Sequence, residues 1–180
     1  KIDNGIPAGA FTRVVREDQE RKDLLFAGTE TGVYLSWNGG KEWTLFQLNL
    51  PIAPITDLRV HKGDLIAATS GRSFWILDDL GLIRQHKTVT DSFALYQPED
   101  PYLTNSYSPL DQTDHSFDGT GVLRGVNPAS GLVIYYHLPT LKPTDELTME
   151  IKDASGRLVR TIRSKKDSLY KGYDGGPSSE

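Results

Sequence analysis

Residues 36–43 read Ser36-Trp-Asn-Gly-Gly-Lys-Glu-Trp43, and this octet decides the fold. It places the short polar side chain of Asn38 directly before two glycines. Glycine adopts the positive φ angles that tight turns require, and an asparagine side chain accepts hydrogen bonds from nearby backbone N–H groups. The octet therefore predicts a tight turn between two β-strands. We expect the indole of Trp43 to pack over this turn as an apolar plug.

The octet resembles the Asp-box of bacterial-neuraminidase-type repeats, whose pattern is Ser-x-Asp-x-Gly-x-x-Trp. Ser36, Gly40 and Trp43 occupy positions of that pattern, and Asn38 replaces the aspartate. In that family the box is a structural turn of a β-propeller blade, set away from the ligand-binding face. The resemblance thus implies an architecture and no chemistry. An alternative interpretation makes Trp37 and Trp43 a platform on which a carbohydrate ring stacks.

Short β-rich runs, separated by Gly, Asn, Asp and Pro, dominate the first half of the chain. They predict strands at residues 11–16, 24–28, 32–37, 43–47, 55–61, 64–69 and 73–77. This spacing is typical of an all-β sandwich, barrel or propeller.

An internal repeat favours the propeller among these architectures. When it is moved forward by 40 residues, segment 25–38 falls on 65–78 without a gap, and Asn38 falls on Asp78. In the second copy, Leu80 replaces Gly40 and Ile83 replaces Trp43. A repeat of about 40 residues, with four strands each, is what a propeller blade requires. The sequence therefore predicts two four-stranded blades, the second with a degraded Asp-box.

Composition excludes several classes of function. The chain has 180 residues, enough for one large domain or two small ones. It contains no cysteine, which excludes disulfides, thiol catalysis and cysteine-ligated metals. The net charge of −4 and the short basic run Arg163-Ser-Lys-Lys166 do not indicate a nucleic-acid partner. No apolar stretch reaches the roughly 18 residues of a membrane span.

The second half of the chain differs from the first in composition and hydrophobic pattern. Residues 91–125 are rich in Asp and Pro, which predicts a loop-rich connector. Residues 131–137 are almost wholly apolar, which predicts a buried strand with His137 in the core or at an edge. Residues 147–152 alternate apolar and polar side chains, Asp153-Ala-Ser-Gly156 predicts a turn, and 158–162 return as the partner strand. This pattern predicts a β-hairpin with one buried face.

Further stretches carry a family resemblance: Asn4-Gly-Ile-Pro-Ala-Gly-Ala-Phe-Thr-Arg-Val-Val-Arg-Glu-Asp18, Ala27-Gly-Thr-Glu-Thr-Gly-Val-Tyr34, Asn49-Leu-Pro-Ile-Ala-Pro-Ile-Thr-Asp57 and Ala68-Thr-Ser-Gly-Arg-Ser-Phe-Trp-Ile-Leu-Asp-Asp79. They resemble large bacterial secreted proteins with neuraminidase-type repeats, described as glycosyl hydrolase-like or sortilin-like. Residues 127–138 and 147–162 resemble the immunoglobulin-like domain that follows the propeller in that group. The resemblance implies an all-β fold, the last blades of a β-propeller followed by a partial immunoglobulin-like β-sandwich. The implied boundaries are 1–90 for the blades, 91–125 for the connector and 126–180 for the sandwich.

Candidate functional side chains are few. Glycoside hydrolysis needs two carboxylates across a sugar site, whereas Asp78 and Asp79 are adjacent and would point to opposite faces of a strand. We therefore interpret them as turn residues. Arg72, Trp75 and Asp78 form a candidate ligand face, because arginine and aromatic side chains suit polar and stacking contacts. For Trp75 we favour burial between blades over a role in this face.

Metal and cofactor signals are weak. The acidic stretch Asp111-Gln-Thr-Asp-His-Ser-Phe-Asp-Gly119 does not fit the calcium-loop pattern. The histidines, at positions 61, 86, 115 and 137, lack ligand spacing. No phosphate-binding glycine loop and no nucleophile elbow is present. The sequence predicts no cofactor, no metal site and no catalytic residue.

The expected function is structural: a non-catalytic C-terminal region of a secreted propeller protein that presents a surface to a protein or polysaccharide ligand. One alternative is a part of a glycoside hydrolase whose carboxylates lie in other blades. A second alternative is sortilin-like peptide binding, with a ligand added to a strand edge. Exposed strand edges also predict self-association. We expect a part of a longer protein that is secreted, periplasmic or at the cell surface.

Overall fold

The computed structural model describes residues 1–86, 93–100, 132–140 and 145–164. The fold is mostly β, built from small antiparallel sheets. The chain divides into two units, residues 1–90 with 94–136 and residues 91–93 with 137–180. We describe each unit by itself.

The first unit holds two antiparallel sheets. The first sheet has the strand order β1-β2-β3-β4, formed by Thr12–Glu17, Leu25–Thr29, Val33–Ser36 and Thr44–Leu45. The second sheet has the order β5-β6-β7, formed by Ile55–His61, Asp64–Thr69 and Phe74–Leu77. The predicted strands of the first half are therefore confirmed to within two residues.

The prediction of a fourth strand in the second sheet is wrong for the described residues. After β7 the chain turns into the short helix α1, Gly81–Gln85. Leu80, at the N-cap of α1, is fully buried in the same core cluster as both sheets. Burial of this leucine favours the helical path, because a fully buried leucine contributes about 1.5–3 kcal/mol to stability.

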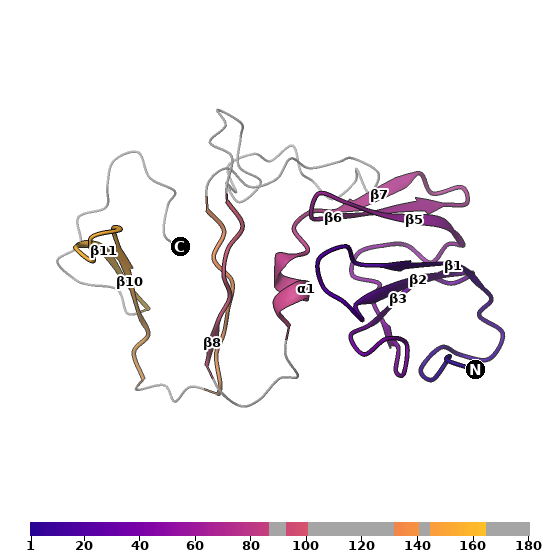
Figure 1. Cartoon of the computed structure of the whole chain (residues 1–180), viewed down its shortest axis with the longest axis horizontal. Helices are drawn as coiled ribbons and strands as arrows, with labels where there is room; N and C mark the ends of the chain where they lie inside the picture. The colour runs from indigo at the N-terminus through magenta and orange to yellow at the C-terminus, as the bar shows by residue number, and fades with distance from the viewer. Residues whose placement is uncertain (87–92, 101–131, 141–144, 165–180) are drawn as a thin grey trace. The chain divides into compact units, whose positions relative to one another are not determined.

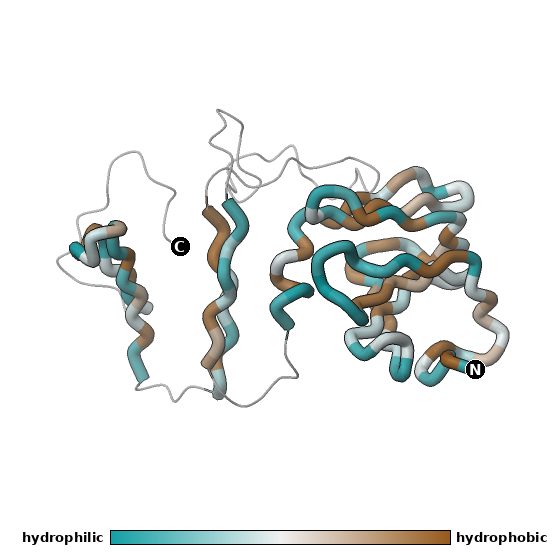
Figure 2. Tube along the Cα trace, viewed as in Figure 1, coloured by the Kyte–Doolittle hydropathy of each residue, from teal (hydrophilic) through white to brown (hydrophobic). Residues whose placement is uncertain are grey.

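The two sheets pack face to face around one apolar core (Figure 1). In the first sheet, residues of one face point into this core: Val14, Phe26, Val33 and Leu35. The second sheet contributes Ile55, Leu58, Val60, Leu65 and Ala67. Apolar residues concentrate along these strands (Figure 2). The alternation of inward apolar and outward polar residues along β5 is the pattern of an antiparallel sheet with one covered face.

Two residues of the first sheet set how closely the sheets approach. A Cβ added at Gly28 would lie 2.6 Å from Cγ2 of Ile55, so only glycine leaves room for the second sheet here. At the edge of the interface, Arg16 Nε donates to the Leu58 carbonyl at 2.9 Å, and its Nη2 bonds Asp57 Oδ1 at 2.7 Å. Arg16 thus clamps β1 to β5.

The two sheets are copies of one plan. In both, the first and second strands pair with an irregularity at the same place, between Thr12 and Val14 in β1 and between Ile55 and Asp57 in β5. In both, a threonine ends the second strand and bonds the carbonyl that precedes the third. Thr29 N–H donates to Gly32 O at 2.9 Å, and Thr69 N–H donates to Ser73 O at 3.2 Å.

The position of this threonine shows that the gapless alignment of 25–38 with 65–78 is wrong beyond the second strand. Because Ser73 matches Gly32, the connection between β6 and β7 is one residue longer than that between β2 and β3. The register agrees, since Leu25 pairs with Ser36 while Leu65 pairs with Leu77. The offset is therefore 40 residues for β6 and 41 for β7. A connecting loop absorbs one extra residue at little cost, so the strand pairing is retained.

The remaining described strands form two small ladders. β8, Ala94–Leu95, pairs with β9, Tyr136–His137, and Tyr96 N–H donates to Tyr135 O at 3.0 Å. The predicted buried strand at 131–137 is wrong for its described part. Tyr135 and Tyr136 are exposed, because within the described residues β9 joins only this two-stranded ladder.

The predicted hairpin at 147–162 is confirmed. β10, Thr148–Lys152, pairs antiparallel with β11, Leu158–Arg163. Gly156 closes the turn at φ 83, and its N–H donates to Asp153 O at 2.9 Å. The expectation of a buried face is wrong in the described part of the chain: all of β11 is exposed, because no described second layer covers it.

Candidate functional site

The octet at 36–43 forms the connection between β3 and β4. The buried Ser36 Oγ accepts a hydrogen bond from Gly40 N–H at 2.9 Å and donates one to Asn38 Oδ1 at 3.0 Å. The same Asn38 oxygen accepts from Glu42 N–H at 3.0 Å. Gly39 and Gly40 have φ values of 71° and 84°, which glycine adopts without strain because it has no Cβ. Asn38 thus supplies the side-chain acceptor for which the family pattern uses aspartate.

Trp43 lies inside the structure. The residue is 4% exposed and packs with Ala27 and Tyr34 on the face of the first sheet that points away from the second. Nε1 of Trp43 donates to the Ile2 carbonyl at 2.8 Å, and its N–H donates to Asn4 O at 2.8 Å. The N-terminal segment therefore covers this face.

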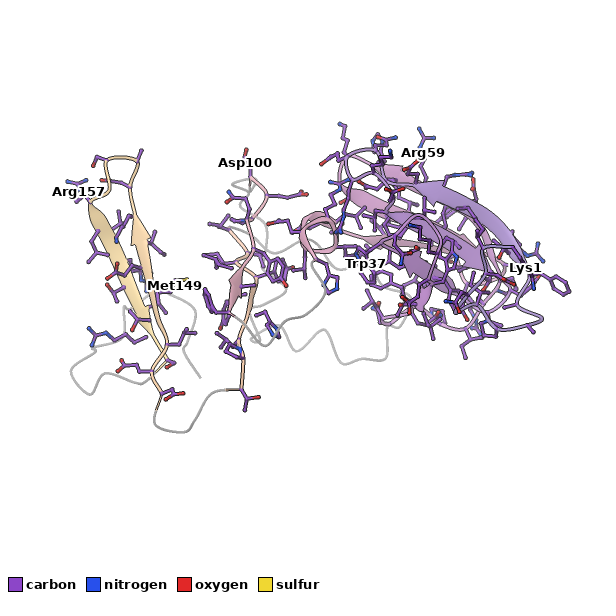
Figure 3. The ribbon with its side chains drawn as sticks, turned by 60° about the horizontal axis from the view of Figure 1, so that its bottom comes forward. Lys1, Trp37, Arg59, Asp100, Met149 and Arg157 are labelled. Atoms are coloured by element: carbon purple, nitrogen blue, oxygen red, sulfur yellow. The ribbon has the colours of Figure 1, made fainter. Side chains whose placement is uncertain are left out.

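The alternative of a carbohydrate platform on Trp37 and Trp43 does not fit this arrangement. Trp37 points toward helix α1 (Figure 3), and its Nε1 donates to the Ile83 carbonyl at 3.2 Å. Its ring lies 4.6 Å from the His86 ring, tilted by 38°. Since Trp43 is buried, the two indoles present no common surface.

The second sheet carries a counterpart of the box, one residue later than the sequence alignment placed it. With the offset of 41, Asp79 and not Asp78 matches Asn38, and Gly81 matches Gly40. Gly81 N–H donates to Asp79 Oδ1 at 2.8 Å. Leu77 stands at the Ser36 position and offers no hydroxyl, so the Asp79 carboxylate takes over as acceptor for the glycine N–H.

Backbone bonds at the two turns confirm this correspondence. Gly39 N–H donates to Asp23 O at 2.9 Å, and Leu80 N–H donates to Gly63 O at 2.7 Å. Asp23 and Gly63 both have positive φ, 66° and 97°. Asp23 and Gly63 therefore each end the turn between the first and the second strand of their sheet.

The structure does not bring Arg72, Trp75 and Asp78 together as a ligand face. Arg72 precedes β7 and Asp78 follows it, so the two lie at opposite ends of this strand. Trp75 is partly buried against the core, and its Nε1 donates to the Arg72 carbonyl at 2.7 Å. This contact holds the loop before β7. Burial raises the pKa of the Asp78 carboxyl, and the nearby Asp64 carboxylate raises it further.

A charge cluster that the sequence did not reveal connects the first sheet with α1. Arg84 bonds the buried carboxylate of Asp18 at 2.9 Å and approaches Glu20 at 3.1 Å and Glu99 at 3.8 Å. Burial alone would raise the pKa of Asp18. The bonds from Arg84 and from the N–H groups of Arg21 and Glu20 outweigh burial and hold that pKa below its usual value. The separation of 66 residues between Asp18 and Arg84 hides this pair from any local sequence pattern.

A small pocket opens between the two sheets at β7. It has a volume of about 60 Å³. Its lining is largely apolar and includes Val33, Phe46, Leu50, Leu65, Trp75 and Leu77. Gln47 also lines it, and its buried Oε1 has no hydrogen-bond partner among the described residues. Pockets that enclose small-molecule ligands are roughly 300–1,000 Å³, so this one suits a single apolar side chain.

The described part of the chain holds no group of three or more His, Asp or Glu side chains placed to bind a metal ion. The acidic stretch at 111–119 lies outside the described residues. Within residues 1–86, 93–100, 132–140 and 145–164, no helix has the length and apolar character needed to cross a membrane.

Comparisons of this chain with models of known protein families, with curated proteins and with solved structures gave no match.

Proposed function

We propose that this chain is a non-catalytic, structural region of a secreted β-propeller protein that packs blade against blade and presents a surface to a protein or polysaccharide ligand. In this proposal the first sheet is a complete blade, the second is an incomplete one, and the hairpin β10–β11 belongs to an immunoglobulin-like sandwich. The observation that carries the proposal is the repeated docking face described next.

The outer face of the second sheet repeats the face by which the first sheet packs on the second. Four positions correspond: Phe26 to Ile66, Gly28 to Ala68, Val33 to Phe74 and Leu35 to Ile76. In the first sheet these residues are buried. In the second sheet, Phe74 is 75% exposed and Ile76 is 60% exposed. Apolar side chains therefore stand uncovered where the repeat uses them for sheet packing.

The polar clamp is repeated as well. Arg59 pairs with Ile66 as Arg16 pairs with Phe26, so the two arginines are equivalent. Arg16 bonds the neighbouring strand at Leu58 and Asp57. Arg59 is exposed (Figure 3), and its side chain makes no hydrogen bond or ion pair with the described residues. A third sheet with the same strand arrangement would cover the apolar face and offer Arg59 the hydrogen-bond acceptors that β5 offers Arg16.

The test compares the native chain with Phe74→Lys. An uncovered apolar face predicts concentration-dependent association in sedimentation velocity and binding of a hydrophobic fluorescent dye. Phe74→Lys is expected to reduce both. Ile52→Lys is the matched control, since Ile52 is 80% exposed outside the strands, and it should change neither.

A native chain that stays monomeric and binds no dye would contradict the proposal, as would an equal response from both lysine variants.

The catalytic alternative has its own test. Release of reducing sugar from a panel of polysaccharides by this chain would show that the region is not structural alone.

A further inference from the structure

β7 is the outermost strand of its sheet, and no other described strand pairs with its free edge. Because Thr69 N–H bonds Ser73 O, the alternation of antiparallel pairing directs the backbone groups of Trp75 and Leu77 toward β6. The N–H and C=O groups of Phe74 and Ile76 then point away from the sheet. No hydrogen bond from another part of the described chain reaches these groups.

The equivalent edge in the first sheet is occupied. There β4 pairs with β3, Leu45 opposite Tyr34 and Thr44 opposite Leu35. Phe46 N–H donates to the Val33 carbonyl at 2.8 Å. Val33 corresponds to Phe74, so the repeat shows which backbone groups of β7 accept a fourth strand.

The residues that directly follow β7 do not fill this edge. They form the turn at Asp79 and then α1, which is held in place from outside the second sheet. Arg84 is paired with Asp18, and Arg21 Nη1 donates to the Ile83 and Arg84 carbonyls at 3.0 and 2.6 Å. The described strands β8 to β11 are paired among themselves. Among the described residues, none supplies a fourth strand to this sheet.

The pocket lies where the inward side chain of such a strand would go. In the first sheet, Leu45 stands opposite Tyr34, whose counterpart in the second sheet is Trp75. Trp75 and Leu77 line the pocket together with Phe46 and Leu50. A volume of about 60 Å³ accommodates one aliphatic side chain.

We propose that β7 is a strand-addition site for an extended segment of a partner protein. The segment runs antiparallel to β7, bonds the backbone of Phe74 and Ile76, and inserts an apolar side chain into the pocket beside Trp75. Its chemistry follows β4, where the polar Thr44 is followed by the apolar Leu45 and Phe46. This site gives the ligand-presenting role proposed above a location and a ligand class, and it rests on that role.

The probe is a synthetic peptide with the sequence of residues 41–49, Lys-Glu-Trp-Thr-Leu-Phe-Gln-Leu-Asn. We expect saturable binding to the full chain in calorimetry. Two changed peptides test the geometry without touching the protein. A peptide N-methylated at its phenylalanine lacks the N–H that would bond Phe74 O, and a peptide with Asp in place of its first leucine puts a charge in the pocket. Each should bind at least about tenfold more weakly.

Two protein variants form a matched pair. Ile76→Pro removes an N–H that points away from β6, and proline is tolerated in edge strands at such positions. Ile76→Ala removes the side chain and keeps the N–H. Both should melt like the native chain, and Ile76→Pro should bind the peptide at least about tenfold more weakly than Ile76→Ala.

Other outcomes overturn the proposal. Failure of the parent peptide to bind, or equal binding of the N-methylated peptide, rules out strand addition by a partner. Slow hydrogen exchange of the Ile76 amide in the free monomer would show that another segment of this chain occupies the edge. The same slow exchange in a dimer would assign the edge to a second copy. Phe74→Lys leaves the backbone edge intact, so loss of blade packing and loss of peptide binding are distinguishable.

Discussion

The Arg84 guanidinium donates to both carboxylate oxygens of Asp18: Nη2 lies 2.9 Å from Oδ2, and Nε lies 3.2 Å from each oxygen. The Asp18 side chain is fully buried and that of Arg84 is 10% exposed. Asp18 also accepts from the N–H groups of Glu20 and Arg21, at 3.0 and 2.7 Å. One carboxylate therefore shapes the β1–β2 connection and holds α1 beside the core.

Asp18→Asn should destabilise the chain by about 3 kcal/mol, because it removes the buried carboxylate that pairs with Arg84 and leaves only the more exposed Glu20 and Glu99 near that charge. The measurement is the free energy of unfolding in urea at pH 7. Glu20→Gln is the control, since Glu20 also pairs with Arg84 but is 66% exposed, and it should cost less than about 1 kcal/mol. Equal losses in the two variants would contradict the role of burial.

The stability of the native chain should fall in acid. The folded pKa of Asp18 is depressed, so its contribution is present above the unfolded pKa of about 3.9 and is lost as pH falls through the lower folded pKa. Burial raises the pKa of Asp78 and Glu99, and these groups act with the opposite sign. Their protonation favours the folded state as pH falls from neutral.

Asp18→Asn isolates the aspartate in this pH profile. Urea unfolding from pH 7 to pH 3 should show a steeper loss below pH 4 for the native chain than for the variant. Parallel curves would mean that Asp18 has the same pKa in the folded and unfolded states.

Gly28→Ala should destabilise the sheet packing by about 1–3 kcal/mol through overpacking. The added Cβ would lie 2.6 Å from Ile55 Cγ2 and 2.7 Å from Val14 Cγ1. Ala68→Val enlarges the equivalent position on the uncovered face, where valine suits a strand, and should change thermal stability little. A large loss at Ala68 would show that its face is covered.

Ser36→Ala should cost about 1–3 kcal/mol, because the Gly40 N–H loses its acceptor in a buried turn. Asn38→Asp restores the aspartate of the box pattern and keeps the oxygen that Ser36 and Glu42 use. A carboxylate accepts hydrogen bonds more strongly than an amide, so thermal melting should show equal or higher stability. A destabilised Asn38→Asp would mean that the amide nitrogen has an essential partner.

Much of the local structure could be predicted from the sequence. Strand positions followed from β-rich runs between turn residues, and the turns at Gly40 and Gly156 followed from the need for positive φ. These features depend on neighbours in the chain. The repeat was also visible, but its register was one residue wrong after Ser70, because a sequence alignment does not show which loop absorbs an insertion.

The candidate ligand face failed for a related reason. Arg72, Trp75 and Asp78 are close in sequence, but Arg72 and Asp78 lie at opposite ends of β7. The Trp75 indole donates a hydrogen bond to the Arg72 carbonyl. The predicted burial of the hairpin at 147–162 also failed, because an alternating pattern indicates which face could be covered and not whether a partner layer covers it.

The sequence by itself determined the strands of the two sheets and of the hairpin, the Asn38 turn and the duplication of the sheet plan, because φ preferences, side-chain alternation and repeats act locally. Only the tertiary structure decided that Leu80 enters the core, that Asp18 meets Arg84 and that α1 takes the place of a fourth strand. These outcomes arise from burial and charge pairing between residues far apart in the chain. Among the described residues, the same long-range packing provides no strand for the edge of β7 and no layer over the outer face of its sheet.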